Sequence, residues 1–234
     1  MPRSSVGGES ALARKRRTGK ILRILDRDYP DAECALHHRT AWELLVATIL
    51  SAQCTDVRVN KVTPALFAAF PTPQRMADAP VEAIEDLVRT TGFFRNKAKA
   101  IKSSAQRIVS EHGGQVPSGI DDLVKLQGVA RKTANVVTGT WFGKATGVVV
   151  DTHVQRISTR LGLTAEKDPK KTERRLMDLL PRKRWVLFSH QVIHHGRQVC
   201  KARRPLCDKC GLARLCPSAD LASLPAPHKA SARK

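Results

Sequence analysis

The chain has 234 residues, of which 41 are Lys or Arg and 21 are Asp or Glu, so its formal net charge is +20. This length can bury one sizeable core or two small ones, and the charge favours a polyanionic partner, with nucleic acid ahead of an anionic membrane surface. The sequence has no apolar run of the roughly eighteen residues that a membrane span needs and no secretion signal, so its six cysteines indicate a reducing compartment, the cytoplasm, rather than disulfides.

The N-terminus is expected to be a basic, disordered tail over residues 1–19, and helical spacing of apolar residues indicates a helix from about Lys15 to Asp28. The basic run Arg14–Lys20 fits either a solvated tail or a phosphate contact. Further helices are expected at about residues 40–54, 57–70, 74–77, 81–89, 98–112, 121–126, 152–161, 170–180 and 182–199, and one opens at about Arg131. Almost nothing indicates a strand, so the predicted fold class is all-α.

Two polar or aromatic positions between these helices stand out. On spacing alone, Gln53 is a surface polar residue, and Asp56 is expected to be the N-cap of the next helix. Phe93 and Phe94 are adjacent and cannot both face one core stripe of a helix. We expect Phe93 to be exposed at a loop tip; the alternative is that both rings seal the space between two helices.

A turn between two helices around residue 128 forms a candidate anion site. Gly128, Val129 and Ala130 lie in this turn, whose backbone N–H groups and following helix N-terminus suit one phosphate. Lys132 is expected in the first turn of that second helix, where the dipole favours loss of its proton and therefore nucleophilic character. Asp151 follows an extended link, Gly147–Val150, and is expected to cap the next helix as an ionised carboxylate.

Four cysteines form the other candidate site. Cys200, Cys207, Cys210 and Cys216 have the spacing C-x6-C-x2-C-x5-C, and four thiolates this close ordinarily bind a metal. Zinc and an iron–sulfur cluster both accept four cysteines. Arg203 and Arg204 lie between the ligands, in a basic loop suited to clamping a phosphate. Cys34 and Cys54 lack partner spacing and are expected to be ordinary buried thiols.

These segments resemble the helix–hairpin–helix DNA glycosylases, most closely the endonuclease III family. The resemblance rests on LQGVARKTANVV (126–137), VDTHV (150–154), LSAQCTD (50–56), GFFRNKA (92–98) and the cysteine spacing, within about residues 20–218. Gln127 and Ala130 depart from it, since the family has proline and a second glycine there. That glycine suggests a positive φ, which would strain Ala130.

The resemblance implies both the domains and the site. It implies a six-helix barrel over residues 34–141 with the hairpin at 121–141, a cluster domain from residues 20–33 and 142–218, and a C-terminal tail over 219–234. It implies a 4Fe-4S cluster on the four cysteines, Lys132 and Asp151 as catalytic residues, Gln53 filling the space left by the damaged nucleotide, and Phe93 wedging into DNA.

The implied function is that of a bifunctional DNA glycosylase and apurinic/apyrimidinic lyase that removes oxidised pyrimidines. Its partner would be double-stranded DNA carrying a damaged base or an abasic site, bound by a monomer, with no membrane. Two alternatives stay open. A monofunctional adenine-mismatch glycosylase lacks the hairpin lysine and carries an extra C-terminal domain. A non-catalytic DNA-binding protein would have no use for both Lys132 and Asp151.

Overall fold

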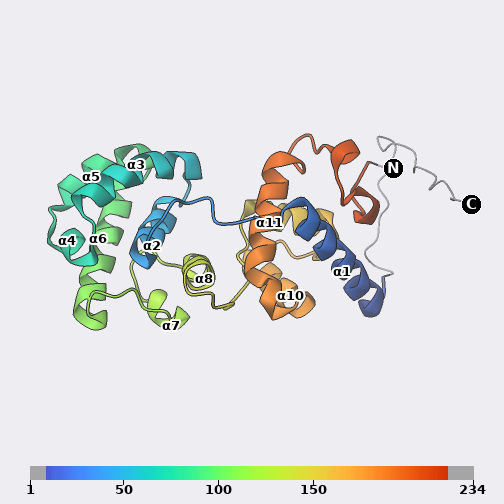
Figure 1. Ribbon diagram of the computed structural model, residues 1–234, viewed down its shortest axis with the longest axis horizontal. Coiled ribbons are helices and arrows are strands. Elements are labelled where there is room, and N and C mark those ends of the chain that lie inside the picture. The colour runs from blue at the N-terminus through green and yellow to red at the C-terminus, as the bar shows by residue number, and fades with distance from the viewer. Residues whose placement is uncertain (1–8, 221–234) are drawn as a thin grey trace, which may run out of the picture. The chain divides into compact units, whose positions relative to one another are not determined.

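The computed structural model describes residues 9–220, and within this range every regular element is a helix, which confirms the predicted all-α fold (Figure 1). None of the helices in that range is long and apolar enough to cross a membrane. The longer elements are α1 (Ala11–Asp28), α2 (Ala41–Leu50), α3 (Asp56–Ala69), α4 (Pro73–Asp78), α5 (Val81–Val88), α6 (Phe94–His112), α7 (Ile120–Leu123), α8 (Arg131–Thr140), α9 (Thr152–Arg160), α10 (Pro169–Leu179) and α11 (Trp185–Gln198).

The chain divides into two compact units, each with its own hydrophobic core. One unit is Cys34–Gly147, here the hairpin unit, and the other combines Met1–Glu33 with Val148–Lys234, here the cysteine unit. The boundary expected at residue 142 is therefore too early. The Thr146 hydroxyl donates to Asn135 Oδ1 at 2.9 Å and lies 2.6 Å from the Thr138 hydroxyl, which ties this segment back to α8.

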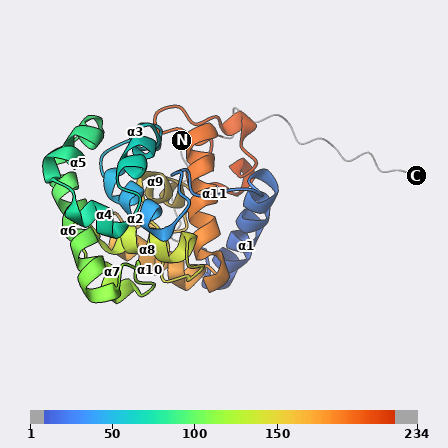
Figure 2. The same ribbon diagram turned by 60° about the vertical axis from the view of Figure 1, so that its left-hand side comes forward.

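The core of the hairpin unit is built around α2. Its residues 42–50 are all buried, as expected for a helix that is apolar on every side. Thr40 caps its N-terminus, and the Glu43 carboxylate accepts the backbone N–H of Arg39, in the manner of a capping box. Helices α3, α6 and α8 pack against α2, while α4 and α5 pack against α6. Figures 1 and 2 both show α2 between these helices.

Two predictions for the segment around Gln53 are wrong. The α2 helix ends at Leu50 rather than Cys54, because the chain leaves helical geometry and Gln53 adopts a left-handed conformation with φ 52°. Thr55, not Asp56, is the N-cap of α3; its hydroxyl accepts the Arg58 N–H, and Asp56 is the first helical residue. An acidic side chain in the first turn still complements the helix dipole.

In the cysteine unit, α1 packs against α11, and α11 against α9. The core consists of apolar residues from these helices, α10 and the C-terminal segment, among them Ile21, Leu25, Val154, Leu176 and Phe188. Figure 2 shows α1 beside α11.

The expected tail over residues 1–19 is corrected from Ala11 onward, where α1 begins. Ser10 caps the helix by accepting the Ala13 N–H. Arg17, from the basic run, donates to the carbonyls of Leu161, Leu215 and Gly162 and to the Glu9 carboxylate, so it is neither solvated nor a phosphate contact. The rest of that tail, residues 1–8, lies outside the described range, as do residues 221–234 of the expected C-terminal tail.

Candidate functional site

Side chains of α6 anchor the turn between α7 and α8. Gly128 has φ 78°, and a Cβ built on it would lie 3.0 Å from the Ala100 Cβ. Both the backbone conformation and the lack of space for a side chain therefore favour glycine at this position. The Ser104 hydroxyl donates to the Gln127 carbonyl at 2.9 Å, and Arg107 donates to the Lys125 carbonyl at 2.9 Å. The turn is therefore a preformed feature of the hairpin unit.

The start of α8 is open to an anion. Ala130 occupies the N-cap position without a side-chain cap, and residues 130–132 are exposed, Lys132 among them. Because alanine at the N-cap position has no side chain that could bond the first N–H groups of the helix, a ligand oxygen can approach them in its place. Val129 is buried, 5% exposed, so only its backbone is available.

The expected strain at Ala130 is absent. Its φ is −82° and its ψ is 169°, an extended conformation that any residue adopts. The one positive φ of this turn falls on Gly128, and alanine at 130 therefore carries no conformational penalty.

Asp151 is the N-cap of α9, as predicted. Its Oδ1 accepts the Val154 N–H at 2.8 Å. The expected extended link leads into it: no strand is assigned over residues 147–150, and the Val149 N–H donates to the Ser189 hydroxyl at 3.1 Å. Asp151 thus has a fixed place in the cysteine unit, while Lys132 has a fixed place in the hairpin unit.

Gln53 and Phe93 have the same unusual backbone. Within residues 9–220 they are the only two residues other than glycine with a positive φ, 52° and 47°. Phe93 is 64% exposed, which confirms the expected loop-tip position and contradicts the alternative that both rings seal a helix interface. Phe94 is half-buried against the core, with the Arg89 and Arg95 guanidinium groups near its ring.

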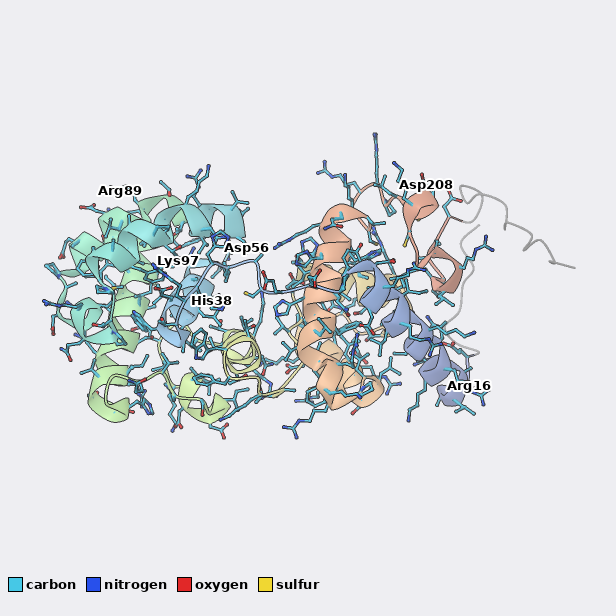
Figure 3. All side chains as sticks on the ribbon, in the orientation of Figure 1. Arg16, His38, Asp56, Arg89, Lys97 and Asp208 are labelled. Carbon is cyan, nitrogen blue, oxygen red and sulfur yellow. The ribbon has the colours of Figure 1, made fainter. Side chains whose placement is uncertain are left out.

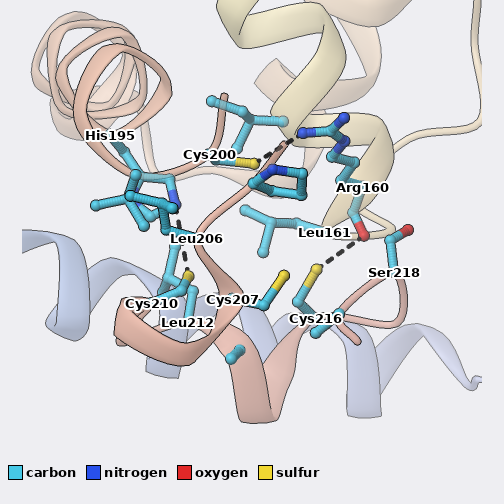
Figure 4. A pocket seen from close by; sticks show the side chains of 15 residues that line it. Arg160, Leu161, His195, Cys200, Leu206, Cys207, Cys210, Leu212, Cys216 and Ser218 are labelled. Atoms are coloured by element: carbon cyan, nitrogen blue, oxygen red, sulfur yellow. Dashed lines mark hydrogen bonds between the residues drawn. The ribbon is translucent and has the colours of Figure 1, made fainter. Parts of the chain in front are cut away.

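All four cysteines of the C-terminal motif line one cavity of the cysteine unit (Figure 4). The rest of its wall is mostly apolar, with Ile157, Leu161, Val199, Pro205, Leu206, Leu212 and Ala213. No three His, Cys, Asp or Glu side chains of the described residues are close enough together to hold a single metal ion. The six cysteines form no disulfide.

The surroundings of the sulfur atoms suit thiolates bound to a cationic group. Burial, followed by the neighbouring thiols, raises the pKa of Cys210 to about 11, and burial also raises the pKa of Cys216. A positive partner would offset that cost. Arg160 donates to Cys200 Sγ at 3.3 Å, and His195 Nε2 lies 3.7 Å from Cys210 Sγ. Burial lowers the pKa of His195 to about 4, so its ring is neutral, and the Tyr29 hydroxyl lies 3.0 Å from its Nδ1.

The basic loop between the first two cysteines is exposed and anchored by α9. Arg203 and Arg204 lie on the surface. Arg160 donates to the carbonyls of Lys201 and Ala202 at 2.8 and 2.7 Å, and Arg156 to the Cys200 carbonyl at 3.0 Å. The helix that Asp151 caps therefore also fixes this loop.

The two anchoring arginines, Arg156 and Arg160, were not among the residues predicted from the sequence, and neither was Lys97, which is buried in the hairpin unit. Arg156 and Arg160 are four residues apart on one helix face, but their partners are backbone carbonyls some forty residues away, which leave no trace in the sequence. Lys97 did leave a signal: it falls in the apolar stripe of its helix with Ile101, Ala105 and Ile108.

Comparisons with known proteins identify the family. Residues 46–182 match the model of the HhH-GPD superfamily of base excision DNA repair proteins. The endonuclease III of Synechocystis is 55% identical over 207 residues, covering 88% of this chain and 94% of the relative. A solved non-covalent endonuclease III–DNA complex has a TM-score of 0.83 at 42% identity, covering 87% of this chain and 95% of that one.

A second solved structure, a trapped covalent endonuclease III–DNA intermediate, has a TM-score of 0.83 at 41% identity, covering 87% of this chain and 96% of that one. These likenesses favour neither the adenine-mismatch glycosylase nor the non-catalytic DNA-binding protein. The chain belongs to the endonuclease III family of HhH-GPD base excision DNA repair proteins.

Proposed function

We propose that Lys132 and Asp151 carry out the chemistry of this enzyme. The chain is a bifunctional DNA glycosylase and apurinic/apyrimidinic lyase of base excision repair, and its partner is DNA. Support for Lys132 comes chiefly from one observation: it is exposed in the first turn of α8, whose N-terminus has no capping side chain and directly follows the hairpin turn. A phosphate bound at that turn would bring the sugar of the damaged nucleotide close to the lysine.

The reaction follows from these groups. The neutral amine of Lys132 forms a bond to the sugar C1′ while the bond from C1′ to the base breaks, and the departing base takes up a proton. The Asp151 carboxylate stabilises the positive charge that develops on the sugar. Opening of the sugar ring gives an imine, loss of a 2′ proton expels the 3′ phosphate and nicks the strand, and water then releases the lysine.

DNA is held at several points in this proposal. The N–H groups around Gly128, Val129 and Ala130 bind one phosphate without reading a base, and Arg203 and Arg204 bind another. The damaged nucleotide leaves the stack, which costs a few kcal/mol and least for damaged bases. Gln53 fills the space it leaves, and Phe93 wedges into the opposite strand. The proposed substrates are oxidised pyrimidines, and the proposed location is the cytoplasm, with the chromosome.

The four cysteines would hold a 4Fe-4S cluster. Support comes from their spacing, their shared apolar cavity, and the Arg160 N–H and the His195 Nε2 beside the sulfur atoms. Such a cluster spreads its four ligands over a larger body than one ion, whereas zinc needs all four thiolates around one point. When bound, it supplies a cationic centre that fixes the loop carrying Arg203 and Arg204.

Borohydride trapping tests the role of Lys132. Reduction of the imine on DNA containing thymine glycol or an abasic site should give a stable covalent adduct with the wild-type protein. Lys132→Ala should abolish the adduct and leave DNA binding largely intact, since one lysine is one charge among many. Lys125→Ala is the matched control, because it removes an exposed lysine of the same hairpin and should keep the adduct. Wild-type protein that binds lesion DNA without ever giving an adduct would contradict the proposal.

A further inference from the structure

The turn that presents Phe93 is strained. Gly92 has φ 70° and Phe93 has φ 47°, so two consecutive residues have a positive φ, and the second has a side chain. A left-handed conformation costs free energy for any residue other than glycine, and such positions persist where the surroundings enforce them. Here the Phe93 turn means residues Thr91–Phe94.

The Phe93 side chain does not hold this turn in place. The ring is 64% exposed, and Phe93 occupies the N-cap position of α6 without a capping side chain. Burial of the ring therefore contributes little to the conformation, and groups outside the ring have to enforce it.

Lys97 contacts the turn at two backbone carbonyls. Its Nζ donates to the Thr91 carbonyl at 2.7 Å, and its backbone N–H donates to the Phe93 carbonyl at 3.1 Å. Thr91 is itself fixed, since it is buried and its hydroxyl donates to the Val88 carbonyl at 2.8 Å. Figure 3 shows Lys97 among the helices of the hairpin unit.

Burial of the Lys97 ammonium group costs free energy of desolvation. The residue is only 5% exposed, and burial lowers the pKa of its ammonium group, although the Cys54 thiol acts in the opposite direction. A methionine would fill the same space without that cost.

We propose that Lys97 is a positioning residue, whose buried amine holds the Thr91 carbonyl and thereby keeps the Phe93 turn in its strained, DNA-inserting conformation before DNA arrives. This inference rests on the proposed wedge role of Phe93. A turn formed in advance does not have to be ordered during base extrusion, so the free energy of DNA binding remains available for unstacking the base.

Lys97→Met tests this inference, with Lys102→Met as a matched control. Lys102 lies in the same helix and also donates from Nζ to a carbonyl, that of Ala79 at 2.6 Å, but it does not contact the Phe93 turn. Lys97→Met should lower the single-turnover rate of base excision from duplex DNA by about ten- to a hundredfold, and Lys102→Met should not. Amide hydrogen exchange in the free protein should become faster at Phe93–Lys97 in the first variant only.

A double-mutant cycle links the effect to the wedge. If Lys97 acts through Phe93, then Lys97→Met should slow excision much less in a Phe93→Ala background than in the wild type. Lys97→Gln, which keeps an N–H donor on a shorter side chain, should restore part of the rate and replaces Lys97→Met if that variant does not fold.

The possible failures can be told apart. If Lys97→Met and Lys102→Met have the same excision rate and the same rate of amide hydrogen exchange at Phe93–Lys97, the proposed role of Lys97 is overturned. A Phe93→Ala variant as active as the wild type would instead contradict the wedge, and the exchange measurement would still decide whether Lys97 holds the turn.

Discussion

At the residue scale, Asp151 caps a helix, and the proposed function gives it a second, separable role. Its Oδ1 caps α9 by accepting the Val154 N–H, and its negative charge is proposed to stabilise the sugar cation. Asparagine caps a helix about as well as aspartate but carries no charge. Alanine has neither the capping oxygen nor the charge. The two substitutions therefore measure the two roles independently.

We expect Asp151→Asn to keep the wild-type unfolding free energy while base excision falls about a hundredfold or more. Cleavage of a preformed abasic site should fall less, because that step no longer needs departure of the base. Asp151→Ala should in addition lose about 1 kcal/mol of stability. Denaturant unfolding and single-turnover kinetics check both. Excision by Asp151→Asn at the wild-type rate would show that the charge is not used.

Single residues differed in how far the sequence could predict them. The cap at Asp151 and the exposure of Phe93 follow from local rules, namely the side-chain chemistry of helix starts and the geometry of a helix face. Arg17 does not, because the carbonyls that accept its N–H groups belong to Leu161, Gly162 and Leu215, far along the chain. A basic run gives no sign of which member turns inward.

At the scale of elements, α6 supports two parts of the site. Lys97 holds the Phe93 turn near its start, and Ser104 and Arg107 hold the hairpin turn further along. Residues 97, 100, 104 and 107 recur at helical spacing, so they share one side of α6. The Phe93 turn and the hairpin turn are therefore fixed relative to each other by one helix.

Gly128→Ala should disrupt the hairpin turn. The added Cβ would meet the Ala100 Cβ at 3.0 Å in a left-handed backbone, which should cost about 1–2 kcal/mol of unfolding free energy from the conformation alone. Binding to DNA with an abasic-site analogue should weaken with it. Ala130→Gly is the control, since its φ of −82° suits either residue and the change should not lower stability. Equal stabilities of the two variants would contradict the role of Gly128.

Apolar periodicity predicted where most helices lie, but not the ends of those that border the site. The α2 helix ends at Leu50, shortly before Gln53, and α6 begins at Phe94, directly after Phe93. Both Gln53 and Phe93 have a positive φ. Helical spacing predicts continuation wherever apolar residues recur. Gln53 and Phe93 adopt left-handed conformations here, and neither residue type signals a turn; only Gly92, directly before Phe93, does.

At the scale of the whole molecule, each unit has its own hydrophobic core, so we expect the two units to be stabilised separately. The hairpin unit buries α2 among its own helices, and the cysteine unit buries α1, α9 and α11 around residues such as Ile157 and Phe188. The proposed cluster belongs to the second core, since Cys200, Cys210 and Cys216 pack against it. Loss of the cluster should therefore affect one unit and spare the other.

Cys207→Ser tests this separation. Because a site closed by four protein ligands contributes to folding, the variant should lose iron, and amide exchange should become faster around residues 200–216 and in α9, whose Arg160 donates to Cys200 Sγ and to the loop. Exchange in the core of Cys34–Gly147 should stay near wild type. With Arg203 and Arg204 no longer held, the slope of log K against log salt should become shallower by about two for DNA binding.

Cys34→Ser is the control, since that thiol lies in the hairpin unit, outside the cysteine cavity, and its variant should keep iron and the wild-type salt dependence. Metal analysis of wild-type protein that finds stoichiometric zinc and no iron would overturn the cluster. Faster exchange throughout both units in Cys207→Ser would contradict their independence. It would mean that the cysteine centre stabilises the hairpin unit as well as the cysteine unit.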